Sequence, residues 1–410
     1  MHPALEKKIR AAGAAETDLA SWGVYYPVVS SSLTARVRLR ARGEDSPRQY
    51  LNFSTSNYLA LGQRPEVASA VARAMEVYGL GANSSPALSG YYDVHETLEQ
   101  ELALFHGAEA AVLFPSGLSA NAGTLAALLG KGDAVVMDEA GHGSLYLGAQ
   151  TGGAEIRFYR HLDHQELDWL LGRFAEEGRT VLLAMIGVYS MTGEIENLPR
   201  AIEIARKHGA ITFLDDAHAV GVLGQEARGS MEHFGLPSGA VDLHMSTLSK
   251  SLSGAGGYVA GPRAAVEFLR FQAKMLLLSA SIPPPVAAGC LEGLRILRRE
   301  GSGMARELRA KATYFAELLC KEGFQAPATG SAILAVRVPD EGKVIPVYRA
   351  LLARGVLVNP ILYPAVPRGE GRLRAAVTLA HSREDLETAA RAFGECAREC
   401  SLLRSLTGRT

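Results

Sequence analysis

Short apolar runs alternate with stretches of helical spacing between about residues 65 and 280. Each run has the length of a strand and is apolar throughout, which is typical of strands buried on both faces of a parallel sheet. The runs lie at 110–114, 134–138, 181–186, 211–215 and 257–260. We therefore expect an α/β fold with a mostly parallel central sheet covered by helices, and a ligand site beyond the carboxyl ends of the strands.

The triple proline at 283–285 ends this alternation. A long helical stretch follows from about 286 to 322, and after it come further strands and helices, at 332–338, 344–354, 355–358 and 383–403. The 410 residues are enough for one large and one smaller domain. We predict three parts: an N-terminal segment, 1–60, that packs with the smaller domain, a large domain, 61–290, and a smaller α/β C-terminal domain, 291–410.

The charge balance excludes several classes of protein. Lysine and arginine number 42 against 43 aspartates and glutamates, so bulk charge indicates neither a nucleic-acid-binding surface nor one attracted to membranes. The four cysteines are scattered and lack companion ligands, which favours reduced thiols in a cytoplasmic protein and no metal site. The longest apolar run, 181–188, is strand-length, so we expect no transmembrane or targeting segment.

Lys250 lies among hydroxyl residues and precedes a glycine-rich turn. A lysine amine can form a Schiff base with an aldehyde, and small neighbours leave room for a ring and its phosphate. Asp215, which ends an apolar run, could pair with a pyridine nitrogen, and His218 with the phenolic oxygen of the same ring. A lone lysine is more often a solvated surface charge. The order of strand, Asp215, His218 and Lys250 predicts pyridoxal 5'-phosphate as the cofactor.

Ser116, Gly117 and Leu118 follow an apolar run and begin a helical stretch. The free amides and the positive end of the helix dipole would accept a phosphate there, and Gly117 permits close approach. A hydroxyl of Thr247, before the lysine, could complete the phosphate site. A capped turn without any ligand explains the Ser116 motif equally well when the motif is taken alone.

Four further side chains have both a functional and a purely structural interpretation. His142 follows another strand and could stack on the cofactor ring, although a lone loop histidine is commonly exposed. Arg374 could hold a substrate carboxylate by a bidentate pair, or be a surface arginine. Ser279 and Ser281 precede the triple proline and could donate to the phosphate across a dimer interface, or be ordinary loop serines.

The motifs occur in one order along nearly the whole chain: 52–59, 89–90, 95–99, 116–117, 189–193, the Asp215 and His218 pair, the Lys250 turn and 366–374. In this order they resemble the α-oxoamine synthase family of fold-type I pyridoxal-phosphate enzymes. Members of that family include 8-amino-7-oxononanoate synthase, 5-aminolevulinate synthase and serine palmitoyltransferase. The resemblance implies a fold-type I transferase fold and a homodimer with shared sites.

The same resemblance implies a role for each matching residue. Lys250, His142, Asp215 and His218 would be catalytic, with Lys250 as Schiff-base lysine and acid or base. The cofactor would also contact Ser116, Gly117, Leu118, Ser190, Thr247, Ser279 and Ser281. The substrate would contact Asn57 and Arg374.

The implied reaction joins an amino acid to an acyl thioester of coenzyme A or an acyl-carrier protein and releases carbon dioxide, free thiol and an α-aminoketone. Departures from the family pattern at 84–86 and 186–187 leave the amino acid and the acyl group open. Two alternatives are an aminotransferase on the same fold and a non-catalytic subunit of a synthase complex. The aminotransferase would accumulate pyridoxamine phosphate with an amino acid alone, and a non-catalytic subunit need not keep Lys250, Asp215 and His218.

Overall fold

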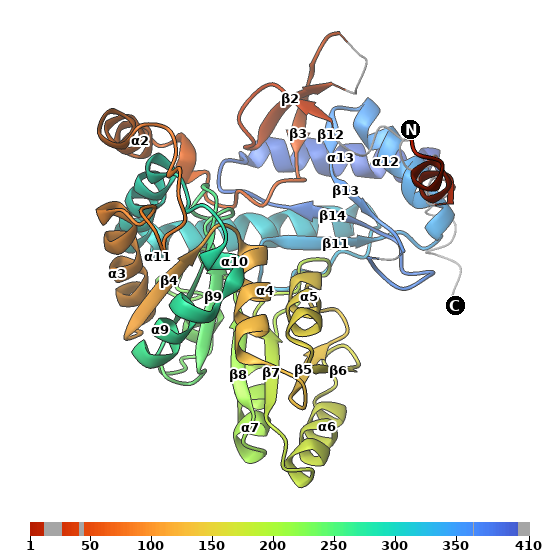
Figure 1. Cartoon of the computed structure of the whole chain (residues 1–410). Helices are drawn as coiled ribbons and strands as arrows, with labels where there is room; N and C mark the ends of the chain where they lie inside the picture. The colour runs from red at the N-terminus through yellow and green to blue at the C-terminus, as the bar shows by residue number, and fades with distance from the viewer. Residues whose placement is uncertain (12–26, 41–44, 364, 401–410) are drawn as a thin grey trace.

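A computed structural model describes residues 1–11, 27–40, 45–363 and 365–400. Three sheets organise these residues, one of seven strands, one of four and one of three. In Figure 1 the large sheet and its helices fill the lower and left parts of the view, and the two small sheets lie above them with the N-terminal strands and the C-terminal helix. Among the described residues, no helix is long and apolar enough to cross a membrane.

The large sheet has the strand order β4-β10-β9-β8-β7-β5-β6. Strands β5 to β9 pair in parallel, whereas β10 is antiparallel to both of its neighbours. The expected mostly parallel α/β sheet is thus confirmed. The strand bounds are β4 (Ala110–Phe114), β5 (Ala134–Asp138), β6 (Glu155–Tyr159), β7 (Val181–Ile186), β8 (Ile211–Asp215), β9 (Leu243–Thr247) and β10 (Gly257–Gly261).

Two of these strands, β6 and β9, were not among the predicted runs. Strand β6 is the sheet edge and carries Glu155 and Arg157. Strand β9 is buried, but it includes His244 and Ser246, whose polar side chains bond inside the core to the Asp216 carboxylate at 3.0 Å and to its carbonyl at 3.3 Å. Polar residues with internal partners are therefore why hydrophobicity alone did not reveal this strand.

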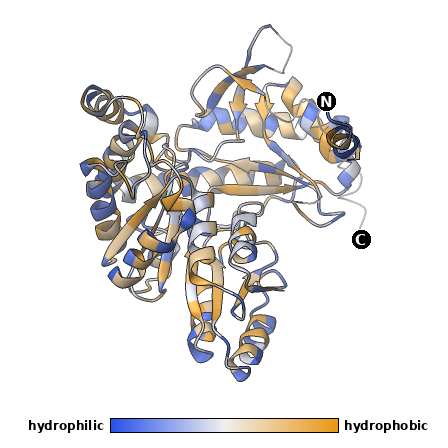
Figure 2. Ribbon diagram, in the orientation of Figure 1, coloured by the Kyte–Doolittle hydropathy of each residue, from blue (hydrophilic) through white to orange (hydrophobic). Residues whose placement is uncertain are grey.

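Helices cover both faces of the large sheet, and Figure 2 shows apolar strands between helices with mixed surfaces. On one face, buried residues of α4, α5, α9 and α10 belong to one hydrophobic cluster with Leu182 and Ala184 of β7, and on the other, those of α6 and α7 belong to a second cluster with Leu183 and Met185. The helix bounds are α2 (Pro65–Tyr78), α3 (Asp93–His106), α4 (Gly117–Leu128), α5 (Gly143–Gly152), α6 (His164–Glu176), α7 (Leu198–Lys207), α8 (Ser230–His233), α9 (Arg263–Gln272) and α10 (Lys274–Leu277).

The long helix α11 (Pro284–Lys321) leads from the large sheet to the small sheets. It begins within the triple proline, because proline is well suited to the first turn of a helix. The three-stranded sheet has the order β11-β14-β13. The remaining elements are β11 (Ile333–Arg337), α12 (Val344–Ala353), β12 (Val356–Leu357), β13 (Asn359–Ile361), β14 (Arg372–Ala376) and α13 (Arg383–Glu399).

The strand expected at 355–358 is confirmed as the short strand β12. A second short strand that was not predicted, β13, follows it in a different sheet. Strand β13 contains Pro360 and lies at a sheet edge, where a residue without an amide hydrogen is tolerated. The expected helix at 383–403 ends at Glu399, and 401–403 lie outside the described residues.

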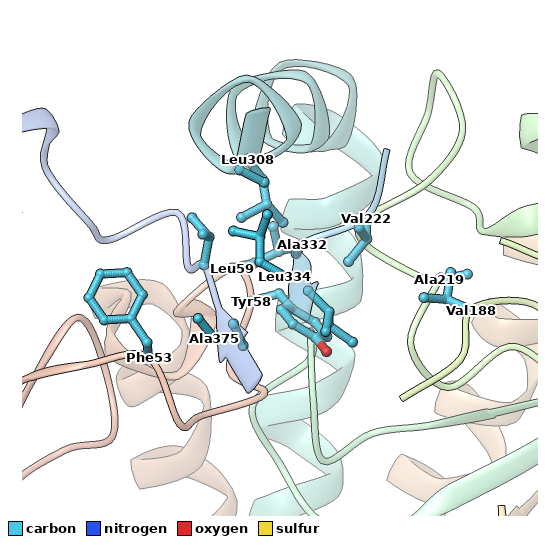
Figure 3. Packing of buried hydrophobic residues seen from close by; sticks show 14 of the residues in the cluster. Phe53, Tyr58, Leu59, Val188, Ala219, Val222, Leu308, Ala332, Leu334 and Ala375 are labelled. Atoms are coloured by element: carbon cyan, nitrogen blue, oxygen red, sulfur yellow. The ribbon is translucent and has the colours of Figure 1, made fainter. Parts of the chain in front are cut away.

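The N-terminal strands β1 (Val28–Val29), β2 (Arg36–Arg40) and β3 (Arg48–Asn52) form the four-stranded sheet with β12. Beyond β3, the chain enters the core between the sheets: Figure 3 shows Phe53, Tyr58 and Leu59 among residues of α11, β11 and β14. This cluster of buried side chains also includes Val188 and Ala219, which follow strands of the large sheet. The packing therefore joins the small sheets to the carboxyl edge of the large one.

Candidate active site

The carboxyl ends of the parallel strands surround a cavity of about 280 Å³, which we call the lysine pocket. Loops after β5, β7, β8 and β9 and the start of α4 contribute to it. Nine residues expected from the sequence line it: Ser116, Gly117, Leu118, His142, Ser190, Asp215, His218, Thr247 and Lys250. The fold thus brings these scattered motifs to one place.

Lys250 lies three residues after β9 and faces the pocket. Burial lowers the pKa of its amine, the Arg374 charge lowers it further, and Asp215 opposes both, which leaves the pKa at about 8. The turn that carries Lys250 is held by Thr247, whose hydroxyl donates to the Gly256 carbonyl at 2.8 Å and lies 2.8 Å from the Ser249 hydroxyl. The pocket therefore contains an amine, carried by a hydrogen-bonded turn, that can gain or lose a proton near neutral pH.

Asp215 is the last residue of β8 and is almost fully buried. Asn121 of α4 donates from Nδ2 to Asp215 Oδ2 at 2.6 Å, and the Ala217 amide donates to Oδ1 at 3.0 Å. The Asn121 amide also donates to Ser144 Oγ at 2.9 Å, and Ser144 Oγ lies 2.7 Å from His142 Nδ1. One chain of hydrogen bonds therefore fixes both the Asp215 carboxylate and the His142 ring.

Asn121 and Ser144 were missed in the sequence analysis, although both line the lysine pocket. Their spacing could have indicated them. Asn121 lies four residues after Gly117 and therefore on the same face of α4, and Ser144 lies two residues after His142. The Oδ1 atom of Asn121 is buried and has no partner among the described residues.

His218 lies in the loop after β8, where Tyr58 approaches it from the core between the sheets. The Tyr58 hydroxyl is 2.7 Å from His218 Nδ1. Burial, and then the charges of Lys250, Arg374 and His142, hold the pKa of His218 well below its ordinary value. The ring is therefore neutral near neutral pH and has a single N–H to donate.

The start of α4 approaches Thr247 closely. A Cβ atom at Gly117 would lie 3.1 Å from Thr247 Oγ1 and 3.2 Å from Thr247 Cβ, so a side chain would crowd this position. Ser116 caps the helix by accepting from the Ser119 amide at 3.0 Å, which leaves the first amides of the helix, those of Gly117 and Leu118, without intrahelical partners. The arrangement fits an anion between the helix start and the hydroxyls of the lysine turn.

Arg374 belongs to β14 of the three-stranded sheet and lies behind Ser190, a residue of the pocket lining. The side chain is buried, and Nε donates to the Ser190 carbonyl at 2.5 Å. Ser190 belongs to a turn we call hairpin 188–195, which is closed by an antiparallel bridge between Val188 and Ile195. The Arg374 charge lowers the pKa of both Lys250 and His218, so the guanidinium acts electrostatically on the pocket from a different sheet.

Besides Arg374, three expected site residues do not line the lysine pocket. Asn57 donates to the Leu33 carbonyl at 3.0 Å and accepts from the Ser253 hydroxyl at 2.7 Å. Ser281 lines a separate cavity of about 460 Å³, where its buried hydroxyl has no partner among the described residues. Ser279, two residues earlier, lines neither of these cavities.

Comparison with known proteins assigns the fold to a family. The family model described as aminotransferase class I and II matches residues 48–393. The chain belongs to this family. An 8-amino-7-oxononanoate synthase of Symbiobacterium thermophilum is 40% identical over 93% of this chain and 96% of its own length, and one of Bacillus subtilis is 36% identical over 87% and 90%.

Solved structures agree with these relatives. A Sphingomonas wittichii serine palmitoyltransferase has a TM-score of 0.90, 31% identity, and coverage of 96% of this chain and 98% of its own. The chain is thus an α-oxoamine synthase, a pyridoxal-phosphate-dependent C-acyltransferase that condenses an amino acid with an acyl thioester and releases carbon dioxide. The predictions of family, fold, cofactor and reaction from the sequence are confirmed.

Proposed function

We propose that the lysine pocket is the place where this α-oxoamine synthase binds pyridoxal phosphate and performs the condensation. The observation that supports this most is that Lys250 and Asp215 line one cavity while the pKa of Lys250 is lowered to about 8. An amine that exchanges protons near neutral pH is suited to act as both base and acid.

The residues present fit the parts of the cofactor. The amides of Gly117 and Leu118, with the Thr247 hydroxyl, would hold the phosphate. The start of α4 provides N–H donors, and glycine at 117 has no side chain to block a close approach. Asp215, held by Asn121, would accept the pyridine N–H. His218, neutral and bonded to Tyr58 at Nδ1, would donate from Nε2 to the phenolic oxygen.

Pyridoxal phosphate, when bound, withdraws electrons from the bonds at an amino acid's α-carbon. Lys250 would take the α-proton at Nζ and return a proton to the same carbon after carbon dioxide has left. Arg374 would hold the substrate carboxylate by charge-assisted hydrogen bonds until the acyl group has been joined. The His142 ring, fixed by Ser144, would cover one side of the site and exclude water.

The relatives suggest the substrates. The product in their name is a nine-carbon acid with a ketone at carbon 7 and an amine at carbon 8. Decarboxylative condensation puts the ketone and the amine on neighbouring carbons. We therefore infer alanine as the amino acid and a thioester of a seven-carbon dicarboxylic acid as the acyl donor, since together they supply this carbon skeleton.

In this reaction a bond forms between the α-carbon of alanine and the thioester carbonyl carbon, and the carbon–sulfur bond breaks. The thiolate leaves and takes a proton from water. The bond to the carboxylate then breaks to give carbon dioxide, and the α-carbon regains its proton from Lys250. The assignment is tested with a panel of amino acids and acyl thioesters, whose products are identified by mass spectrometry. Alanine with the seven-carbon donor should give the highest kcat/KM. Preference for serine with a long-chain donor would contradict it.

We also propose that the enzyme is a homodimer with shared sites. Large apolar side chains are exposed around the cavity that contains Ser281: Leu88 and Leu278 are each 83% exposed, and Phe271 is 67% exposed. A second copy of the chain would cover them and bring Ser279 and Ser281 near its lysine pocket. Sedimentation should show a dimer that Leu278→Asp weakens, and a fully active monomer would rule the proposal out.

A further inference from the structure

A group of charged side chains, buried at Asp138 and partly exposed at Glu194, lies beside the lysine pocket at the end of β5. His161 is at its centre, in the loop between β6 and α6. Its Nδ1 lies 3.0 and 3.1 Å from the carboxylate oxygens of Asp138, and its Nε2 lies 3.0 Å from Glu194 Oε2. The ring therefore bridges two carboxylates.

A carboxylate accepts hydrogen bonds and has none to donate, so both ring nitrogens of His161 must carry a proton to satisfy both contacts. Only the imidazolium form does so. Burial works to lower the pKa of His161, but the hydrogen bonds to Asp138 and Glu194 outweigh it and raise the pKa to about 9. At neutral pH the ring is therefore a cation held between two anions.

Other titratable groups face this ring. The Glu139 carboxylate accepts from the His161 amide at 3.2 Å, and the Tyr189 ring lies edge-on with centroids 4.5 Å apart. Arg372 of β14 is close enough to Glu194 to help lower its pKa. Glu196 and His164 are joined to the same hydrogen-bond network through the Tyr189 hydroxyl, which donates to Asp138 and Glu196. The buried Tyr159 hydroxyl lies near them without a hydrogen-bond partner among the described residues.

The two carboxylates belong to two different parts of the site. Asp138 ends β5 and accepts from the Ala140 amide at 2.7 Å, which fixes the turn that carries His142. Glu194 lies in hairpin 188–195, which also carries the Ser190 carbonyl that accepts from Arg374. His161 is therefore a link between the His142 turn and the segment that orients Arg374.

The hairpin has a second restraint on its other side. A Cβ atom at Gly193, where φ is 77°, would lie 2.3 Å from the Ile333 carbonyl oxygen of β11. The hairpin thus packs directly against the small sheet. Two contacts hold it to Asp138 at the end of β5: the His161 ring through Glu194, and the Tyr189 hydroxyl, which donates to Asp138 Oδ2 at 2.9 Å. A change at His161 would remove the restraint through Glu194, and the Ser190 carbonyl that accepts from Arg374 would then be held to the large sheet less tightly.

We propose that His161 is a positioning residue: as an imidazolium it clamps hairpin 188–195 to the Asp138 turn and so keeps Arg374 oriented toward the substrate carboxylate. This inference rests on the role proposed above for Arg374. It also implies that one of the two hydrogen bonds of His161 is lost when the ring loses a proton, because a neutral ring donates to one carboxylate and not to both.

The test is the alanine dissociation constant of the holoenzyme, read from the spectral change on binding between about pH 7 and pH 10. His161→Gln keeps one N–H donor and removes the charge. The ratio of its dissociation constant to that of the wild type should be about tenfold near neutral pH, the loss expected for one charged hydrogen bond. The ratio should fall toward one above about pH 9, since the wild-type ring is then neutral as well. Titration of the alanine amine and of Lys250 cancels in the ratio.

His208→Gln is a matched control. His208 pairs with Asp168 at 2.6 Å, but it precedes β8, at the end of the strand opposite to Asp215. The ratio of the alanine dissociation constant of His208→Gln to that of the wild type should stay near one at every pH. His161→Arg keeps a cation with several donors, so relative to this variant the wild type should weaken as the pH passes about 9. That comparison decides the question if the Gln variant does not fold.

A second measurement is the thermal stability of the cofactor-free protein. A raised pKa in the folded chain stabilises it fully below the ordinary histidine pKa and progressively less as the pH rises to about 9. The difference in melting temperature between the wild type and His161→Gln should therefore shrink over this range. A binding ratio that is constant with pH, or equal to one throughout, would overturn the role of His161. If Arg374→Ala left alanine binding unchanged, the failure would lie instead with the proposed role of Arg374.

Discussion

Asn121 Nδ2 donates a hydrogen bond of 2.6 Å to Asp215 Oδ2, and this contact fixes the carboxylate at the floor of the lysine pocket. Asn121 comes from the first turns of α4 and Asp215 from the end of β8, 94 residues later. The contact thus connects the helix proposed to hold the cofactor phosphate with the residue proposed to hold its ring nitrogen. A change in α4 is therefore expected to affect both the phosphate contacts and the ring-nitrogen contact of the cofactor.

We expect Asn121→Ala to weaken pyridoxal-phosphate binding by about 1.5–3 kcal/mol, the range for a hydrogen bond to a charged group. Equilibrium titration of cofactor-free protein measures the change. Thr124→Val is the control, because the Thr124 hydroxyl lies one turn further along α4, buried and without a partner among the described residues. An equal loss of affinity in both variants would show that the helix, and not the contact with Asp215, is responsible.

Lys250 should react with aldehydes at a rate that rises as the pH increases through about 8, because the neutral amine is the nucleophile. Formaldehyde labelling of cofactor-free protein with a mild reductant, read by peptide mass spectrometry, measures this, and exposed Lys131 serves as an internal reference. Arg374→Gln removes a positive charge that lowers the pKa of Lys250, so the midpoint should move to higher pH. A midpoint unchanged by this variant would contradict the electrostatic link between the two residues.

Gly117→Ala should reduce cofactor affinity by roughly tenfold or more, since the new methyl group would crowd Thr247 where the phosphate is proposed to bind. Gly143→Ala is matched to it: Gly143 is likewise the first residue of a helix, α5, and a Cβ atom there has no neighbour within 4 Å. That variant should bind the cofactor normally. Normal binding by Gly117→Ala would argue against a phosphate site at the start of α4.

The sequence was most informative where neighbouring residues act together. Asp215 and His218 lie at the end of an apolar run that was predicted as a strand. Thr247 and Lys250 were found from their own hydroxyl-rich motif, although the strand before them, β9, was not predicted. The start of α4 was predictable for the same reason, since a strand, Ser116 and Gly117 are consecutive. These motifs meet because parallel strands end at the same edge of a sheet.

Contacts made between distant segments were not predictable in this way. The contact of Tyr58 with His218 and that of Arg374 with Ser190 join residues 160 and 184 positions apart, and they depend on how the small sheets pack on the large one. Ser279 and Ser281 illustrate the converse. They were assigned through the resemblance to a dimeric family, and a single chain does not bring them to the lysine pocket.

The stoichiometry of the complete reaction tests the central claim most directly. Purified enzyme with alanine and a seven-carbon dicarboxylic thioester is assayed at once for free thiol, carbon dioxide and the aminoketone. We predict equal amounts of all three, and loss of all three in Lys250→Ala. Pyridoxamine phosphate and a keto acid from the amino acid, with no thiol released from any thioester tested, would contradict the account and indicate an aminotransferase.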